Sequence, residues 1–134
     1  VLLGGSEDRE NGDTIVEQSN GRAYNACGKY SINQSASLIK QAGLVITHDT
    51  GLMHIAAAFH KKIISIWGNT VPELGMYPYM PHPESTLFEI RGLPCKPCTK
   101  LGFKKCPKKH FRCILDIDDS AVASKALELY TKDL

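Results

Sequence analysis

The chain has 134 residues, of which 43% are hydrophobic and 22% are charged. This is enough for one compact domain with a hydrophobic core and too little for two, and the balance excludes intrinsic disorder and collagen-like repeats. The longest uncharged apolar runs fall far short of the roughly 20 residues that cross a bilayer, so no membrane-spanning helix is predicted. The chain begins at Val1-Leu2-Leu3 without an initiator Met or a signal-peptide pattern, and we expect it to be a piece of a longer protein.

The basic residues are distributed unevenly. The formal net charge is only +2, but eight of the sixteen Lys and Arg residues lie in the 22-residue stretch from Arg91 to Arg112, which contains no acid. The rest of the chain holds eight basic residues against fourteen acidic ones. The stretch is therefore expected to face an anion.

The N-terminal part reads as a short strand, a helix and a second strand. Leu2 and Leu3 predict a buried strand that ends at Gly4-Gly5. A helix over residues 6–19 is expected to follow, because a serine and two acids provide a cap and a negatively charged first turn. Residues 22–26 predict the second strand.

The next helix has the clearest boundaries. Ser31 and Gln34 fit a capping box, in which each side chain bonds the backbone N–H of the other residue. Gly43 is predicted to end the helix in the left-handed conformation that favours glycine.

Strands and helices then alternate. Residues 44–47 form an apolar, β-branched run typical of a strand buried on both faces of a parallel sheet. Residues 52–59 predict an alanine-rich helix, residues 63–67 a buried strand and residues 87–90 another strand. Asp118 is expected to cap a last helix. This order predicts an α/β fold, a Rossmann-like doubly wound parallel sheet with helices on both faces. One face of the last helix is expected to hold Val122, Ala126, Leu129 and Tyr130.

Ligands of such sheets bind beyond the carboxyl ends of the strands, and the segment 48–54 is the most informative of these positions. Asp49, Thr50 and Gly51 lead into the alanine-rich helix, followed by Leu52 and His54. Free amides and the helix dipole favour an anion such as a diphosphate, and Asp49 suits sugar hydroxyls. The alternative is that Asp49 only caps the helix through the amides of Gly51 and Leu52 while His54 packs in the first turn.

Two earlier strand ends supply weaker candidates. Asp8 follows the glycine pair and can accept hydrogen bonds from ribose hydroxyls, although simple solvent exposure is the more frequent fate of such a residue. Lys29 and Tyr30 offer an ammonium group and a ring that suit a phosphate and a base, or they are plain surface residues.

Four cysteines fall in the basic stretch. Cys95, Cys98, Cys106 and Cys113 have a spacing that suits a zinc site, with His110 as an ambiguous further ligand, and free thiols are the alternative. With the surrounding lysines, Phe103 and Phe111, they also allow a nucleic-acid-binding knuckle. A solvated loop, or a loop that attracts an anionic acceptor or membrane surface, is the other interpretation. Cys27 stands apart and is expected in the core.

Several motifs together resemble the ADP-heptose:lipopolysaccharide heptosyltransferases of glycosyltransferase family 9. The specific element is Asp49-Thr50-Gly51-Leu52-Met53-His54 with the later Gly68-Asn69-Thr70. Supporting similarity extends from Leu3-Gly4-Gly5 to Cys113. The family more often has proline where this chain has Asn69.

The resemblance implies that residues 1–134 are a single donor-binding domain, the C-terminal half of a GT-B glycosyltransferase whose N-terminal acceptor domain lies outside this chain. The donor-binding residues would be Asp8, Lys29, Tyr30, Asp49, Thr50, Gly51, Leu52, His54 and Thr70.

The implied activity is inverting transfer of heptose or a related sugar from an ADP-sugar to the lipopolysaccharide core, without metal or cofactor. The general base would belong to the N-terminal domain, so this chain alone is expected to be inactive. The expected partners are the nucleotide-sugar donor and the lipopolysaccharide acceptor, with peripheral membrane contact and no nucleic acid. The expected location is the cytoplasm, at the inner face of the inner membrane. A non-catalytic nucleotide-sugar binding module is the alternative within this class.

Overall fold

A computed structural model describes residues 1–103 and 105–132. The chain forms two compact units, Val1–Leu38 and Ile39–Leu134, and each is described by itself. Lys104, one of the basic residues counted above, lies outside the described residues. The expectation that residues 1–134 form one domain stays a prediction.

In the first unit, the predicted helix is confirmed as a 3-10 turn, η1 (Ser6–Asp8), that continues into α1 (Arg9–Gln18). The strands predicted at residues 2–3 and 22–26 are reduced to one isolated parallel bridge between Leu2 and Asn25. At this bridge the N–H of Leu2 donates to the carbonyl of Tyr24 at 2.8 Å, and the N–H of Ala26 donates to the carbonyl of Leu2 at 2.9 Å.

Helix α2 (Ile32–Gln41) begins with the predicted capping box. The N–H of Ser31 donates to Oε1 of Gln34 at 2.9 Å, and the N–H of Gln34 donates to Oγ of Ser31 at 3.4 Å. The prediction for Gly43 is wrong, since Gly43 is not among the residues with a positive φ. The helix ends instead by tightening, with the N–H of Ala42 donating to the carbonyl of Ile39 at 3.1 Å, so no left-handed residue is needed.

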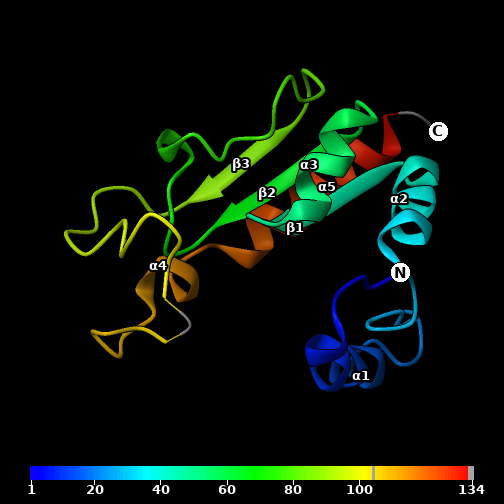
Figure 1. The fold of residues 1–134 in the computed structure, drawn as a ribbon, viewed down its shortest axis with the longest axis horizontal. Helices are drawn as coiled ribbons and strands as arrows, with labels where there is room; N and C mark the ends of the chain where they lie inside the picture. Colours follow the sequence, from blue (N-terminus) through cyan, green and yellow to red (C-terminus); the bar gives the residue numbers. More distant parts are fainter. Residues whose placement is uncertain (104, 133–134) are drawn as a thin grey trace. The chain divides into compact units, whose positions relative to one another are not determined.

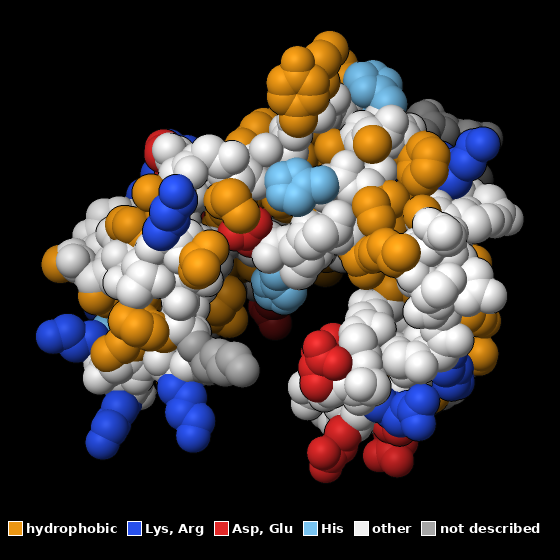
Figure 2. Space-filling model, in the orientation of Figure 1, with side chains coloured by type: hydrophobic (Ala, Val, Ile, Leu, Met, Phe, Trp, Pro, Cys, Tyr) orange, Lys and Arg blue, Asp and Glu red, His pale blue; other side chains and the backbone are white. Residues whose placement is uncertain are grey.

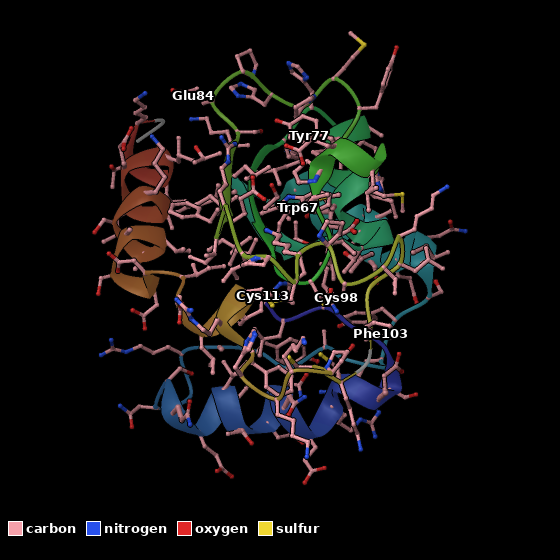
Figure 3. The ribbon with its side chains drawn as sticks, turned by 90° about the vertical axis from the view of Figure 1, so that its left-hand side faces the viewer. Trp67, Tyr77, Glu84, Cys98, Phe103 and Cys113 are labelled. Carbon is pink, nitrogen blue, oxygen red and sulfur yellow. The ribbon has the colours of Figure 1, made fainter. Side chains whose placement is uncertain are left out.

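The second unit contains a parallel sheet of β1 (Leu44–His48), β2 (Lys62–Trp67) and β3 (Thr86–Glu89), in the order β1-β2-β3. Helices α3 (Gly51–Ala58) and α5 (Asp119–Thr131) lie on opposite faces of this sheet (Figures 1 and 3). The predicted parallel α/β architecture is therefore confirmed.

The core of this unit is centred on β2. Ile63, Ile64 and Trp67 are almost completely buried, together with Met53 of α3 and Leu129 of α5. The prediction that the strand at residues 44–47 is buried on both faces is wrong, because Ile46 in β1 is 52% exposed. In the described sheet β1 is an edge strand that pairs with β2.

The last helix begins as predicted, with the N–H of Ala121 donating to Oδ1 of Asp118 at 3.0 Å. Leu129 lies in the core, but Tyr130 is 55% exposed and does not share the buried face as predicted. Two short helices, η2 (Pro72–Leu74) and α4 (Arg112–Leu115), occupy stretches where the sequence predicted no element. Within the described residues, no helix has the length and apolar character needed to span a membrane.

Candidate functional site

A cavity of about 340 Å³ opens beyond the carboxyl ends of β1 and β2, where ligands of parallel sheets bind. The segment that follows β3 forms its other wall. Its lining residues are His48, Asp49, Ile66, Gly68, Asn69, Thr70, Cys98, Leu101, Phe103, Lys105, Cys106, Phe111, Cys113 and Ile114.

Asp49 and Thr70 join the two strand ends at this cavity. The hydroxyl of Thr70, which is only 5% exposed, donates to Oδ2 of Asp49 at 3.1 Å. Asp49 itself is half-buried. One carboxylate oxygen is thus fixed by the protein, while the carboxylate still borders the cavity as a hydrogen-bond acceptor.

The start of α3 is open beside Asp49. Its N-cap is Thr50, and no side chain caps the helix. The interpretation that Asp49 merely caps α3 is therefore wrong, because its carboxylate is held by Thr70 instead. A Cβ built on Gly51 meets no atom within 4 Å, so the first turn is accessible to a ligand.

Asn69 holds the cavity's second wall against the end of β2. Its side-chain amide donates to the carbonyl of Phe103 at 2.8 Å, and its own carbonyl accepts from the N–H of Cys98 at 2.9 Å. Gly102 lies against the same side chain, since a Cβ built there would come within 2.6 Å of Oδ1 of Asn69. Asn69 therefore bonds the second wall at Cys98 and at Phe103, on both sides of Gly102 in the sequence.

A buried ion pair fixes the start of the same segment. Nζ of Lys96 lies 2.8 Å from Oε2 of Glu89 at the end of β3, and both side chains are at most 6% exposed. Lys96 also donates to the carbonyls of Trp67 and Ile90, at 3.3 and 3.4 Å. Burial acts to raise the pKa of Glu89, but hydrogen bonds from Lys96 and Arg91 outweigh it, and the pKa is lowered. Glu89 therefore stays ionised.

The thiols of this wall differ in character. Cys98 and Cys113 both line the cavity (Figure 3), and burial, followed by the neighbouring cysteines, raises the pKa of Cys98. Backbone N–H groups, foremost that of Phe111, lower the pKa of Cys106. Sγ of Cys95 lies 3.6 Å from Nε2 of His110. Within residues 1–103 and 105–132, no group of three or more His, Cys, Asp or Glu side chains is arranged to hold a metal ion.

Asp8, Lys29 and Tyr30 belong to the first unit. Asp8 is exposed, and its Oδ2 accepts from the N–H of Gly5 at 2.9 Å. Nζ of Lys29 lies 4.7 Å from the ring centroid of Tyr24. Hydrogen bonding to Tyr30 and the charge of Lys29 lower the pKa of Tyr24, and the same hydrogen bond raises the pKa of Tyr30. Sequence reasoning missed Tyr24, which carries no motif. Cys27 is buried, as predicted.

The structure brings Asp49 and Thr70 together at the cavity, whereas Thr50, Gly51, Leu52 and His54 do not line it. His54 is exposed in the first turn of α3. No pattern in the sequence pointed to the second wall, formed by Cys98, Phe103 and Phe111, although the basic and aromatic composition of that segment is unusual.

A parallel sheet with helices on both faces and a cavity beyond its strand ends defines a Rossmann-like α/β protein. The sequence profile of glycosyltransferase family 9 (heptosyltransferase) matches residues 1–115. The chain belongs to this family.

Curated relatives of this chain are heptosyltransferases. It is 30% identical over 115 residues to lipooligosaccharide heptosyltransferase 2 of Campylobacter jejuni, and the matched residues are 86% of this chain and 34% of that protein. It is 31% identical over 77 residues to lipopolysaccharide heptosyltransferase 2 of Escherichia coli K12, which covers 54% of this chain and 22% of that protein. The chain thus spans about a third or less of the length of these relatives.

Two solved structures share the fold. One is ADP-heptose lps heptosyltransferase II of E. coli, with a TM-score of 0.74 and 23% identity, covering 98% of this chain and 36% of that one. The other is a family 9 glycosyl transferase from Veillonella parvula, also with a TM-score of 0.74 and 23% identity, covering 97% and 36%. The fold class expected from the sequence is confirmed by both.

Proposed function

We propose that this chain supplies the donor site of an inverting glycosyltransferase of the GT-B type, which transfers heptose or a related sugar from an ADP-sugar to a lipopolysaccharide core. The observation that carries this proposal is the hydrogen bond from Thr70 to Asp49 at a cavity beyond two parallel strands. It holds a carboxylate next to the uncapped start of α3, where amides and the helix dipole favour an anion.

The chemistry of a sugar diphosphate matches these parts. Sugar hydroxyls need acceptors, and the free oxygen of Asp49 is one. The diphosphate needs N–H donors and positive charge, which the first turn of α3 and the lining residue Lys105 offer. A cavity of about 340 Å³ lies near the lower end of the usual range for small-molecule sites, about 300–1,000 Å³.

The remaining donor contacts in this proposal are Asp8 for the ribose, Lys29 and Tyr30 for the nucleotide, and Thr50, Gly51, Leu52 and His54 at the start of α3. Amides and basic side chains would stabilise the departing diphosphate. The general base that deprotonates the acceptor would come from the N-terminal domain, so the isolated chain would bind donor without turnover. In this proposal the enzyme would work in the cytoplasm, at the inner face of the inner membrane.

Calorimetric titration of the chain with ADP-heptose, a GDP-sugar and a UDP-sugar tests the proposal. We expect the ADP-sugar to bind best, and Asp49→Ala to weaken its binding by about tenfold, or about 1.4 kcal/mol. Asp119→Ala, on the exposed first turn of α5, is the matched control and should bind as the wild type does. Equal weak binding of all three nucleotide-sugars by the wild type and Asp49→Ala would contradict the proposed donor site.

A further inference from the structure

The segment that forms the second cavity wall carries a surface that extends beyond the donor site, and only two of its members, Leu101 and Lys105, also line the cavity. Figure 2 shows Lys and Arg side chains interspersed with hydrophobic ones over this part of the molecule. We call this the basic-apolar surface, and its exposed members are Lys100, Leu101, Lys105, Lys108, Lys109 and Leu115.

The positive charge of this surface is largely uncompensated. No ion pair among the described residues involves any of its four lysines. Arg112 nearby is paired with Asp116, with Nε and Oδ2 2.7 Å apart. Since the sequence from Arg91 to Arg112 contains no acid, neighbouring side chains of the stretch offer the lysines no counter-charge. A polyanionic surface would complement them.

The apolar members are equally unusual. Leu101 is 82% exposed and Leu115 is 72% exposed, which places two aliphatic side chains in solvent among the lysines. Phe103 and Phe111, 48% and 46% exposed, border the same segment. Lysines interspersed with leucine and aromatic side chains are the composition of protein surfaces that lie in the headgroup region of an anionic bilayer.

We propose that the basic-apolar surface docks on an anionic lipid membrane. The lysines would bind the phosphate headgroups, and Leu101 and Leu115 would enter the boundary with the acyl chains. A nucleic acid would satisfy the same charge, but bases stack on aromatic rings and gain little from aliphatic side chains, and the two most exposed apolar residues here are leucines. An anionic bilayer therefore accounts for both the lysines and the leucines of the surface.

The residues chosen for the test separate this surface from the donor site, because Lys108, Lys109 and Leu115 do not line the cavity. The test uses Lys108→Glu/Lys109→Glu and Leu115→Ser. The matched controls are Arg9→Glu/Arg22→Glu, which changes the net charge equally at two exposed positions, and Leu127→Ser, which removes an exposed leucine of α5.

Co-sedimentation of the chain with phosphatidylcholine vesicles, with and without phosphatidylglycerol, measures the partition coefficient. We expect binding only to the anionic vesicles, decreasing with salt. The double lysine variant should lose at least about 25-fold, at about fivefold for each positive charge removed, and the two new carboxylates add repulsion to this loss. Leu115→Ser should lose several-fold with the same salt dependence, because only apolar contact is removed. Both control variants should bind as the wild type does.

Two results would overturn the proposal. One is equal sedimentation of the wild type and Lys108→Glu/Lys109→Glu. The other is binding to a single-stranded RNA, measured by fluorescence anisotropy, that is tighter than binding to the vesicles and insensitive to Leu115→Ser. An ADP-heptose titration of the same variants separates the two proposals, since the surface variants should leave donor binding unchanged.

Discussion

The hydroxyl of Thr70 donates to Oδ2 of Asp49 at 3.1 Å, and it thereby links the loop after β2 to the loop after β1. These loops follow two hydrogen-bonded parallel strands, in which His48 is opposite Ile66. The sheet register thus sets the distance between the loops, and the hydrogen bond sets the orientation of the carboxylate.

Thr70→Val keeps the shape of the side chain and removes the donor. We expect ADP-sugar binding to weaken about three- to tenfold, because Asp49 would lose the bond that orients it, and such bonds contribute about 0.5–1.5 kcal/mol. Thr70→Ser retains the hydroxyl and should restore most of the affinity. Isothermal titration calorimetry of the three proteins checks this, and a valine variant with wild-type affinity would contradict it.

Lys96→Met leaves the buried carboxylate of Glu89 without its main partner. We expect a loss of about 3–5 kcal/mol in the free energy of unfolding, the usual cost of leaving a buried charge unpaired. Adding Glu89→Gln should recover part of this loss, because the remaining group is neutral. Urea denaturation of both variants measures the effect. A double variant less stable than Lys96→Met would show that the orphaned charge is not the cause.

Glu84 predicts a specific acid sensitivity. Its carboxylate lies 2.6 Å from Nζ of Lys132 and 2.9 Å from Nζ of Lys62, and hydrogen bonds from Lys132 and then Lys62 lower its pKa from 4.5 to about 2. A folded-state pKa below the unfolded value stabilises the protein above about pH 4.5, and this contribution is lost as the pH falls through about 2. We therefore expect the Tm of Glu84→Gln to fall less steeply than that of the wild type between these pH values.

The control for this comparison is Glu73→Gln, which removes an exposed carboxylate in η2. Thermal unfolding followed by circular dichroism at a series of pH values gives the slopes. Parallel Tm curves for Glu84→Gln and the wild type would exclude Glu84 as a source of the acid sensitivity.

Gly12→Ala should destabilise the first unit although alanine is the better helix former. A Cβ at Gly12 would come within 2.4 Å of Oδ1 of Asn25. Asn25 has little freedom to move, because its amide donates to Asp13 at 2.7 Å and its Oδ1 accepts from the N–H of Cys27 at 3.0 Å. We expect a loss of about 1–3 kcal/mol from overpacking, against the gain of about 0.5–1 kcal/mol usual at an exposed helical glycine. Hydrogen exchange of the α1 amides measures this loss of stability. Slower exchange in Gly12→Ala than in the wild type would contradict the prediction.

Local signals predicted the elements well where the signal and the structure depend on the same residues. The capping box of Ser31 and Gln34 defined the start of α2, and the apolar run at residues 63–67 predicted the most buried strand. Gly43 was predicted wrongly because the helix ends in a tightened turn that needs no left-handed residue. The first strands are shorter than predicted, with one isolated bridge between Leu2 and Asn25.

The candidate site was predictable on one side only. Asp49 and Thr70 follow strands that the sequence identified, so their meeting is a consequence of parallel pairing. The second wall depends on contacts between distant positions, such as Asn69 with Phe103 and Lys96 with Trp67. A single sequence does not reveal such pairs, because neither residue forms a recognisable motif with the residues beside it in the chain.

The contact between Asn69 and Gly102 makes these positions interdependent. A side chain larger than hydrogen at residue 102 would collide with the amide of Asn69, and Gly102 also has a φ of +77° that favours glycine. A chimera that receives residues 95–115 from another member of the family therefore has to receive that protein's residue at position 69 as well. Residue 69 and residues 95–115 are separated in the chain, but they have to be exchanged together.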